Sequence, residues 1–212
     1  MKMDRRRFLS LFSAATLAAI SEAAPIGRVD SQTFSSPAFG FSLRIPDGWS
    51  TWTTEDVDSW PEVPDYAEDA DEPQGWGTPI IVFSRLKEPT PEPNAAVCVY
   101  GDHKSIWMGT SILTFAESAI DYTVSNLRAP LVHHSVHSLI LDGYTAARAT
   151  LEYDGIDDGG RRSRVQDDTM MMFHLDYLLV FQFLQPSVGS GRAESELEHV
   201  ERSIQLLRHK RK

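Results

Sequence analysis

Three histidines stand close together between His133 and His137 and form the densest group of potential metal ligands in the sequence. On a helix, His133 and His137 would lie one turn apart on the same face, where both could bind one zinc ion. On a strand they share a face with Ser135, His134 points away, and about 13 Å separates them at roughly 3.3 Å per residue. Because the stretch falls inside a predicted strand, Leu131 to Leu141, we expect a polar strand face here and no metal site.

Two further groups of side chains carry suitable atoms for metal binding but have unsuitable spacing. Acids between positions 65 and 72 offer oxygen ligands for calcium, but they lack the Asp-x-Asp-x-Asp-Gly order of a dedicated loop. Met170, Met171 and Met172 offer thioethers for copper, yet adjacent side chains of a strand alternate between faces and cannot converge. A solvated acidic loop and a methionine-filled core explain these residues better. The sequence therefore predicts no metal and no cofactor.

The sequence contains no arrangement of residues that is typical of catalysis. Gly189-Ser190-Gly191 lacks the Gly-x-Ser-x-Gly elbow of serine hydrolases and suits the lead-in to a helix. The Gly155–Gly160 stretch contains acids, which would repel a phosphate group. Cys98 lies in an apolar run with nothing nearby to lower its pKa, so we interpret it as a buried, inert thiol. We expect no catalytic residue.

The first 23 residues have the layout of a secretory signal, with a basic start, an apolar middle and small residues at the end. Arg-Arg-x-Phe-Leu near the start is the twin-arginine pattern, so Arg5 and Arg6 are the expected pair read by the Tat translocase. The apolar part is shorter than the roughly 20 residues that span a bilayer. We expect cleavage after Ala23, with a retained anchor as the alternative, and hence a periplasmic or extracellular protein whose mature chain has no transmembrane span.

Composition limits the classes of protein that remain. The whole chain carries 20 Lys and Arg against 30 Asp and Glu, a net charge of −10, and the signal holds four of these bases and two of the acids, so the mature chain has a net charge of −12. A nucleic-acid binder needs a basic face, which this charge argues against. The mature chain has the length of one domain. Its single cysteine excludes an internal disulfide and fits export after folding in a reducing compartment.

Alternation with period two predicts strands, and spacings of three and four predict helices. The predicted strands are Phe39 to Ile45, Pro79 to Leu86, Ala95 to Gly101, Leu131 to Leu141, Tyr144 to Tyr153, Arg164 to Phe173 and Tyr177 to Leu184, and the predicted helices are Ser111 to Leu127 and Arg192 to Leu207. Turns at Asp142-Gly143, Gly155–Gly160 and Asp176 should join the last four strands as antiparallel hairpins. This order predicts an α+β fold, an antiparallel β-sheet flanked by two helices in an α/β/α sandwich.

Residues 54–77 form an acidic insertion between predicted elements. The segment holds nine acids and no Lys or Arg, together with Trp60, Tyr66 and Trp76. Disordered linkers have few aromatic residues, whereas Trp and Tyr are frequent interface anchors, so these three are the predicted partner-binding residues. The predicted organisation is a signal (1–23), a linker (24–32), a single domain (33–208) that contains the insertion, and a basic tail (209–212).

Four short stretches resemble the PsbP-like superfamily, which includes DcrB-type bacterial envelope proteins and a eukaryotic Ran-binding protein. They are Phe41–Trp49 (FSLRIPDGW), Asp142–Ala147, Tyr177–Phe181 and Glu196–Leu206. The resemblance covers most of the mature chain. It implies an antiparallel sheet with helices on both sides, and a binding or accessory role rather than catalysis. The long insertion, and the absence of the lipid-attachment cysteine that many bacterial relatives carry, depart from the family pattern.

Two functions remain open from the sequence. The first is an exported, non-catalytic binding or accessory protein of the cell envelope that binds a protein partner. The alternative is an exported enzyme, dependent on a metal or small molecule, with an unrecognised site, because Tat export often serves proteins that carry a cofactor. The missing catalytic arrangement and the aromatic residues of the acidic insertion favour the first.

Overall fold

The structure is a computed structural model that describes residues 27–53, 78–85, 95–103, 109–126, 130–156, 162–186 and 191–207. Three predicted features lie outside the described residues. They are the signal with Arg5 and Arg6, the acidic insertion with Trp60, Tyr66 and Trp76, and the basic tail.

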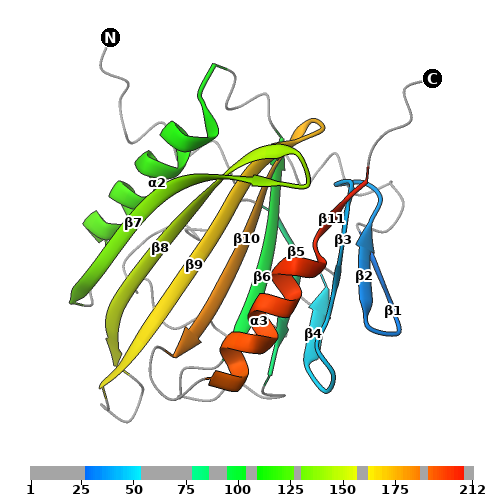
Figure 1. Ribbon diagram of the computed structural model, residues 1–212, viewed down its shortest axis with the longest axis horizontal. Coiled ribbons are helices and arrows are strands. Elements are labelled where there is room, and N and C mark those ends of the chain that lie inside the picture. Colours follow the sequence, from blue (N-terminus) through cyan, green and yellow to red (C-terminus); the bar gives the residue numbers. More distant parts are fainter. Residues whose placement is uncertain are drawn as a thin grey trace.

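The described strands form two antiparallel sheets (Figure 1). The larger has the order β4-β5-β6-β10-β9-β8-β7, with β4 (Ser50–Thr53), β5 (Thr78–Ser84), β6 (Ala96–His103), β7 (Leu131–Leu141), β8 (Tyr144–Ile156), β9 (Arg162–His174) and β10 (Tyr177–Pro186). The smaller has the order β1-β2-β3-β11, with β1 (Arg28–Asp30), β2 (Thr33–Ser36), β3 (Phe41–Arg44) and β11 (Gln205–Leu206). In Figure 1 the long strands β7 to β10 lie side by side on the left, and the small sheet stands on the right.

Two helices cover opposite faces of the larger sheet. α2 (Ile112–Asn126) packs on β7, β8 and β9, while α3 (Gly191–Ser203) packs on β10 and on β3 of the small sheet. Along β9 the side chains alternate between two cores: Met171 lies in the core under α2, and Met170 and Met172 lie in the core under α3. All three are fully buried, so the α/β/α arrangement and the core-filling role of the methionines are confirmed. Among the described residues, no helix is long and apolar enough to cross a membrane.

The predicted hairpins in the second half of the chain are confirmed. β7 pairs with β8, β8 with β9 and β9 with β10, all antiparallel. Asp142 (φ 47°) and Gly143 (φ 85°) are both left-handed, as a two-residue type I′ turn requires. The strand prediction for the histidine stretch also holds, because His133 and His137 are exposed and four residues apart on β7. That separation along a strand is too great for one ion.

Two boundaries predicted from the sequence differ from the structure. Part of the predicted linker is folded, because β1 (Arg28–Asp30) pairs with β2. The stretch Phe41–Arg44 was expected in the main sheet, but it pairs with β2 and β11 and so belongs to the smaller one. The other strands of this sheet, β1, β2 and β11, have two to four residues, too few to show a reliable period in the sequence, which is why the second sheet was not predicted.

The last helix ends at Ser203 and not at Leu207 as predicted. The Ser203 hydroxyl donates to the Val200 carbonyl at 2.6 Å and accepts the Arg44 backbone N–H at 2.8 Å. The chain then leaves the helix and pairs with β3, with Leu206 buried and Leu207 exposed. The helical stripe therefore ends one residue beyond α3, at Ile204, which is buried.

The stretch Phe39–Ser50 connects the two sheets. The Phe39 ring lies so close to Gly101 of β6 that a Cβ added there would come within 2.3 Å of it, and Phe41 and Leu43 are buried. The chain turns after Ile45, because the Trp49 N–H donates to the Pro46 carbonyl at 3.2 Å and Gly48 has a φ of 78°. A type II turn has glycine at this position because only glycine adopts such a φ without strain.

Candidate functional site

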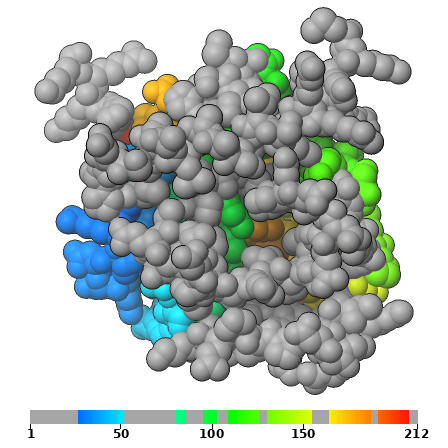
Figure 2. All heavy atoms as spheres, turned by 180° about the vertical axis from the view of Figure 1, so that it is seen from behind, coloured from blue at the N-terminus to red at the C-terminus, as the bar shows by residue number. Residues whose placement is uncertain are grey.

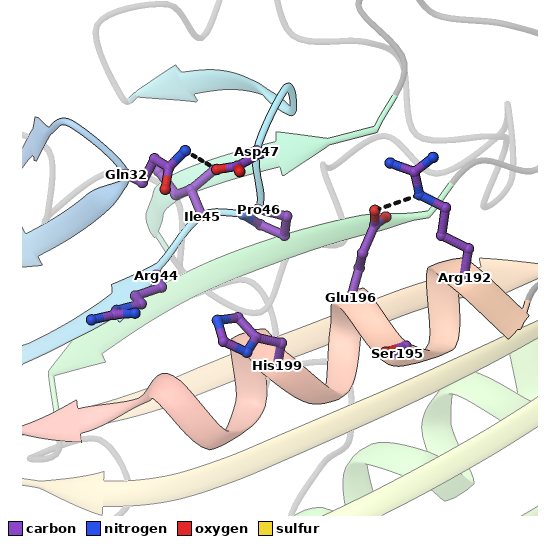
Figure 3. Close-up of a pocket in the computed structure, with 9 residues that line it drawn as sticks. All are labelled: Gln32, Arg44, Ile45, Pro46, Asp47, Arg192, Ser195, Glu196 and His199. Carbon is purple, nitrogen blue, oxygen red and sulfur yellow. Dashed lines mark hydrogen bonds and ion pairs between the residues drawn. The ribbon is translucent and has the colours of Figure 1, made fainter.

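A groove of about 470 Å³ lies between α3 and the chain that leaves β3 (Figure 3). α3 supplies Arg192, Glu196 and His199 to one wall, and the opposite wall includes Arg44 and Asp47. Figure 3 shows Glu196 and His199 rising from α3 towards the turn that follows β3. The helix and the turn therefore place charged groups of both signs around one concave surface.

Trp49 fixes the position of α3 relative to this turn. Its ring is almost fully buried, with its centroid 6.0 Å from that of Phe83 on β5. Its Nε1–H donates to Oε2 of Glu196 at 3.2 Å, while Arg192 Nε donates to Oε1 of the same carboxylate at 2.9 Å. Glu196 is thus held from both sides, and Trp49 is a core residue that also reaches α3.

The opposite wall of the groove is held by side chains as well. Gln32, at the β1–β2 turn, donates a hydrogen bond to Asp47 Oδ1. Ser203 holds the Arg44 backbone at the far end of α3. The groove therefore presents donors at Arg44, Arg192 and His199 and acceptors at Asp47 and Glu196, a mixture that suits polar groups of a bound chain segment.

A second concentration of polar groups lies inside the larger sheet, on the same face as α2. Asp167 of β9 is buried, and both of its oxygens accept hydrogen bonds, Oδ2 from Gln182 at 2.6 Å and Oδ1 from Thr169 at 2.9 Å. Desolvation by burial raises the pKa of Asp167 from 3.8 to about 6, although these two hydrogen bonds oppose the shift. The carboxyl group is buried and both of its oxygens accept hydrogen bonds, so it orders the interior of the sheet.

Cys98 lies beside this network, directly opposite Gln182 in the pairing of β6 with β10. Burial raises the pKa of the thiol to about 12, and its hydrogen bond with Tyr100 only partly opposes that shift. Burial likewise raises the pKa of Tyr100, with the neighbouring Cys98 contributing in the same direction. A thiol that stays protonated at neutral pH is a poor nucleophile and a poor metal ligand. The predicted burial of Cys98 is confirmed.

The structure does not group the residues singled out in the sequence into one site. Among the described residues, no three His, Cys, Asp or Glu side chains are clustered as metal ligands would be. The predicted partner-binding residues Trp60, Tyr66 and Trp76 lie outside the described part of the chain, and their role stays a prediction. What the described residues do show is their attachment: β4 ends at Thr53, β5 begins at Thr78, and the two strands pair antiparallel.

The sequence reasoning did not identify the residues of the groove or of the buried network. A signal existed for Asp167, because alternation along β9 places it on the same face as the buried Met171. No local pattern reveals the groove. Its residues come from the two ends of the chain, and only the packing of α3 against the small sheet brings them together.

No family model matches the chain, and no curated protein matches it. Among solved structures, the chain is similar to cyanobacterial PsbP (CyanoP) from Synechocystis sp. PCC 6803, with a TM-score of 0.50 and 15% identity over 86% of this chain and 99% of that one. LpqN of Mycobacterium tuberculosis, described as involved in cell envelope biogenesis, gives a TM-score of 0.44 with 12% identity over 79% of this chain and 83% of that one. The Saccharomyces cerevisiae Ran-binding protein Mog1p gives a TM-score of 0.40 with 12% identity, over 79% of this chain and 90% of that one.

Identities this low establish a likeness of fold and nothing further. The CyanoP structure is matched over almost its whole length. The chain therefore has the PsbP-like α+β fold that its sequence resemblance implied.

Proposed function

We propose that this chain is an exported, non-catalytic accessory protein of the cell envelope that binds a protein partner through the acidic segment 54–77. The observation that carries the proposal is the way this segment is attached. Thr53 of β4 lies opposite Ile81 of β5, so the paired strands hold both ends of the segment at one edge of the larger sheet. A segment fixed at a sheet edge can meet a partner without disturbing the two cores.

The composition of the segment indicates the chemistry of the partner. Nine acids without a Lys or Arg complement a basic surface and speed its approach. Trp60, Tyr66 and Trp76 would provide the anchors, since truncating such residues commonly costs about 2 kcal/mol or more of binding free energy. The partner expected from these features is a protein with a basic surface that contains apolar pockets.

Deleting residues 55–74 is expected to abolish partner binding and leave the fold intact, because Thr54 and residues 75–77 can still connect the strands. The measurement is photo-crosslinking in the exported compartment, with a photoreactive phenylalanine in place of Tyr66 and, as a matched control, in place of Tyr122 on α2. We expect one protein adduct specific to position 66 and at least tenfold weaker capture of that protein by the deletion variant. Equal adducts at both positions, or undiminished capture by the deletion variant, would show that the segment does not bind the partner.

We further propose that export proceeds through the Tat translocase, which reads Arg5 and Arg6. Changing both to lysine should leave the chain in the cytoplasm as an unprocessed precursor, while Arg7→Lys should not. Immunoblots of fractionated cells measure both its size and its compartment. Normal export of the double variant would contradict this route.

A further inference from the structure

β7 forms one end of the larger sheet, and within the described residues no strand pairs with its outer side. It is 11 residues long, whereas β4 at the other end has only four. Most of its side chains are exposed, including Ile140 at 68% and Val132 at 44%. In Figure 2 the green and yellow-green atoms of this region of the chain lie at one margin of the molecule. β7 is therefore a long, accessible edge.

Most of the features that normally keep such an edge from pairing are missing here. Proteins usually protect an exposed edge with lysine or other charged residues, with proline, with a bulge or by keeping the strand short. β7 contains no Asp, Glu, Lys, Arg or Pro, and its one irregularity is a bulge at its start, between Leu131 and His133. The regular part from His133 to Leu141 presents its backbone N–H and C=O groups without any formally charged side chain.

The charge of the chain indicates what can cover this edge. The chain has a net charge of −10, so two copies repel each other overall. β7 holds no formal charge, so two copies can meet along it without adding to that repulsion. We propose that β7 pairs antiparallel with β7 of a second copy, which joins the two larger sheets across a two-fold axis. This inference goes beyond the proposed function and does not depend on it.

The sequence of β7 matches itself when the two-fold axis passes at Val136. On the face towards α2, Val136 then lies opposite Val136 of the second copy, and His134 lies opposite Ser138. Apolar residues therefore meet apolar residues, and an imidazole meets a hydroxyl with which it can form a hydrogen bond.

The opposite face is matched in the same register. Within the regular part of the strand, His133 lies opposite Leu139 of the second copy, and Ser135 lies opposite His137. No pair in the register brings two formal charges together. A contact of this kind is closed, since each copy uses its own β7 edge once, and it yields a dimer and not a filament.

The test is a charge exchange at His134 and Ser138, which are both exposed and face each other only across the proposed interface. The variant His134→Lys/Ser138→Lys places like charges opposite each other twice, whereas His134→Lys/Ser138→Glu places opposite charges there. Within one copy the two positions are four residues apart along the strand, too far to contact each other. The two variants therefore differ mainly across the interface.

Sedimentation of the full chain should give a dimer at micromolar concentration. The dissociation constant should be roughly tenfold larger for the Lys/Lys variant and close to that of the wild type for the Lys/Glu variant. Circular dichroism checks that each variant is folded. A monomeric wild type would overturn the proposal and leave the edge to a strand of another protein. Equal dissociation constants for the two variants would also overturn it, because the dimer would then use another surface.

Discussion

Replacing Phe41 with alanine is expected to lower the free energy of unfolding by about 3–5 kcal/mol, the range found when large core side chains are truncated. Phe41 lies on β3 of the small sheet and is fully buried. Its ring meets that of Phe181 on β10 edge-on, with centroids 5.3 Å apart, and lies 5.8 Å from the ring of Phe34 on β2. One side chain therefore joins the small sheet to the larger one, and its loss leaves a cavity between them.

Urea unfolding followed by tryptophan fluorescence measures this loss. Val29→Ala, on the exposed side of β1, is the control and should change stability by no more than about 0.5 kcal/mol. Phe41→Leu keeps part of the buried volume, so its loss of unfolding free energy should lie between those of Phe41→Ala and Val29→Ala. If Phe41→Ala cost no more than the Val29 control, the two sheets would not depend on this ring for their packing.

The parts of the fold that the sequence predicts well are those whose pattern is long and local. The strands from Leu131 to Pro186 carry enough residues for their alternation to be read, and Asp142-Gly143 determines its turn through the left-handed conformation that these residue types tolerate. β1, β2, β4 and β11 have two to four residues each, so their formation depends on the neighbours that they meet in space. Ser203 illustrates this, because its bond to Arg44 replaces a helical continuation that the local pattern favours.

The candidate sites also differ in whether a local sequence pattern indicates them. The burial of Cys98 and Met170–Met172 could be predicted, because an apolar run or an alternating strand is itself the signal. The arrangement of Trp49, Glu196 and Arg192 could not be predicted, because Trp49 and Glu196 are 147 residues apart in the chain. The role of Trp49 in holding α3 depends on a hydrogen-bond partner, Glu196, that no local pattern around Trp49 indicates.

Asp167 should make the protein more stable in mild acid than at neutral pH, relative to a variant that lacks this carboxyl. Its pKa is about 6 in the folded protein, against an ordinary value of 3.8 that applies once the chain unfolds. Because the folded state holds the proton more tightly, the contribution of Asp167 is most favourable below about pH 4 and is lost as the pH rises through 6. A shift of this size corresponds to about 3 kcal/mol over the whole titration, of which about 2 kcal/mol falls between pH 4.5 and 7.5.

The comparison with Asp167→Asn isolates this contribution from the other titrating groups of an acidic chain. An asparagine at position 167 cannot ionise. The Gln182 side-chain amide can turn so that its oxygen accepts a hydrogen bond from the NH₂ group of this asparagine, which keeps the contact between the two side chains. Urea unfolding at pH 4.5 and 7.5 should show the variant gaining about 2 kcal/mol relative to wild type as the pH rises. Asp176→Asn in the exposed β9–β10 turn also removes one negative charge and should follow the wild-type profile. If the difference between wild type and Asp167→Asn did not change with pH, the buried carboxyl would titrate alike in the folded and unfolded chains, and burial would not be raising its pKa.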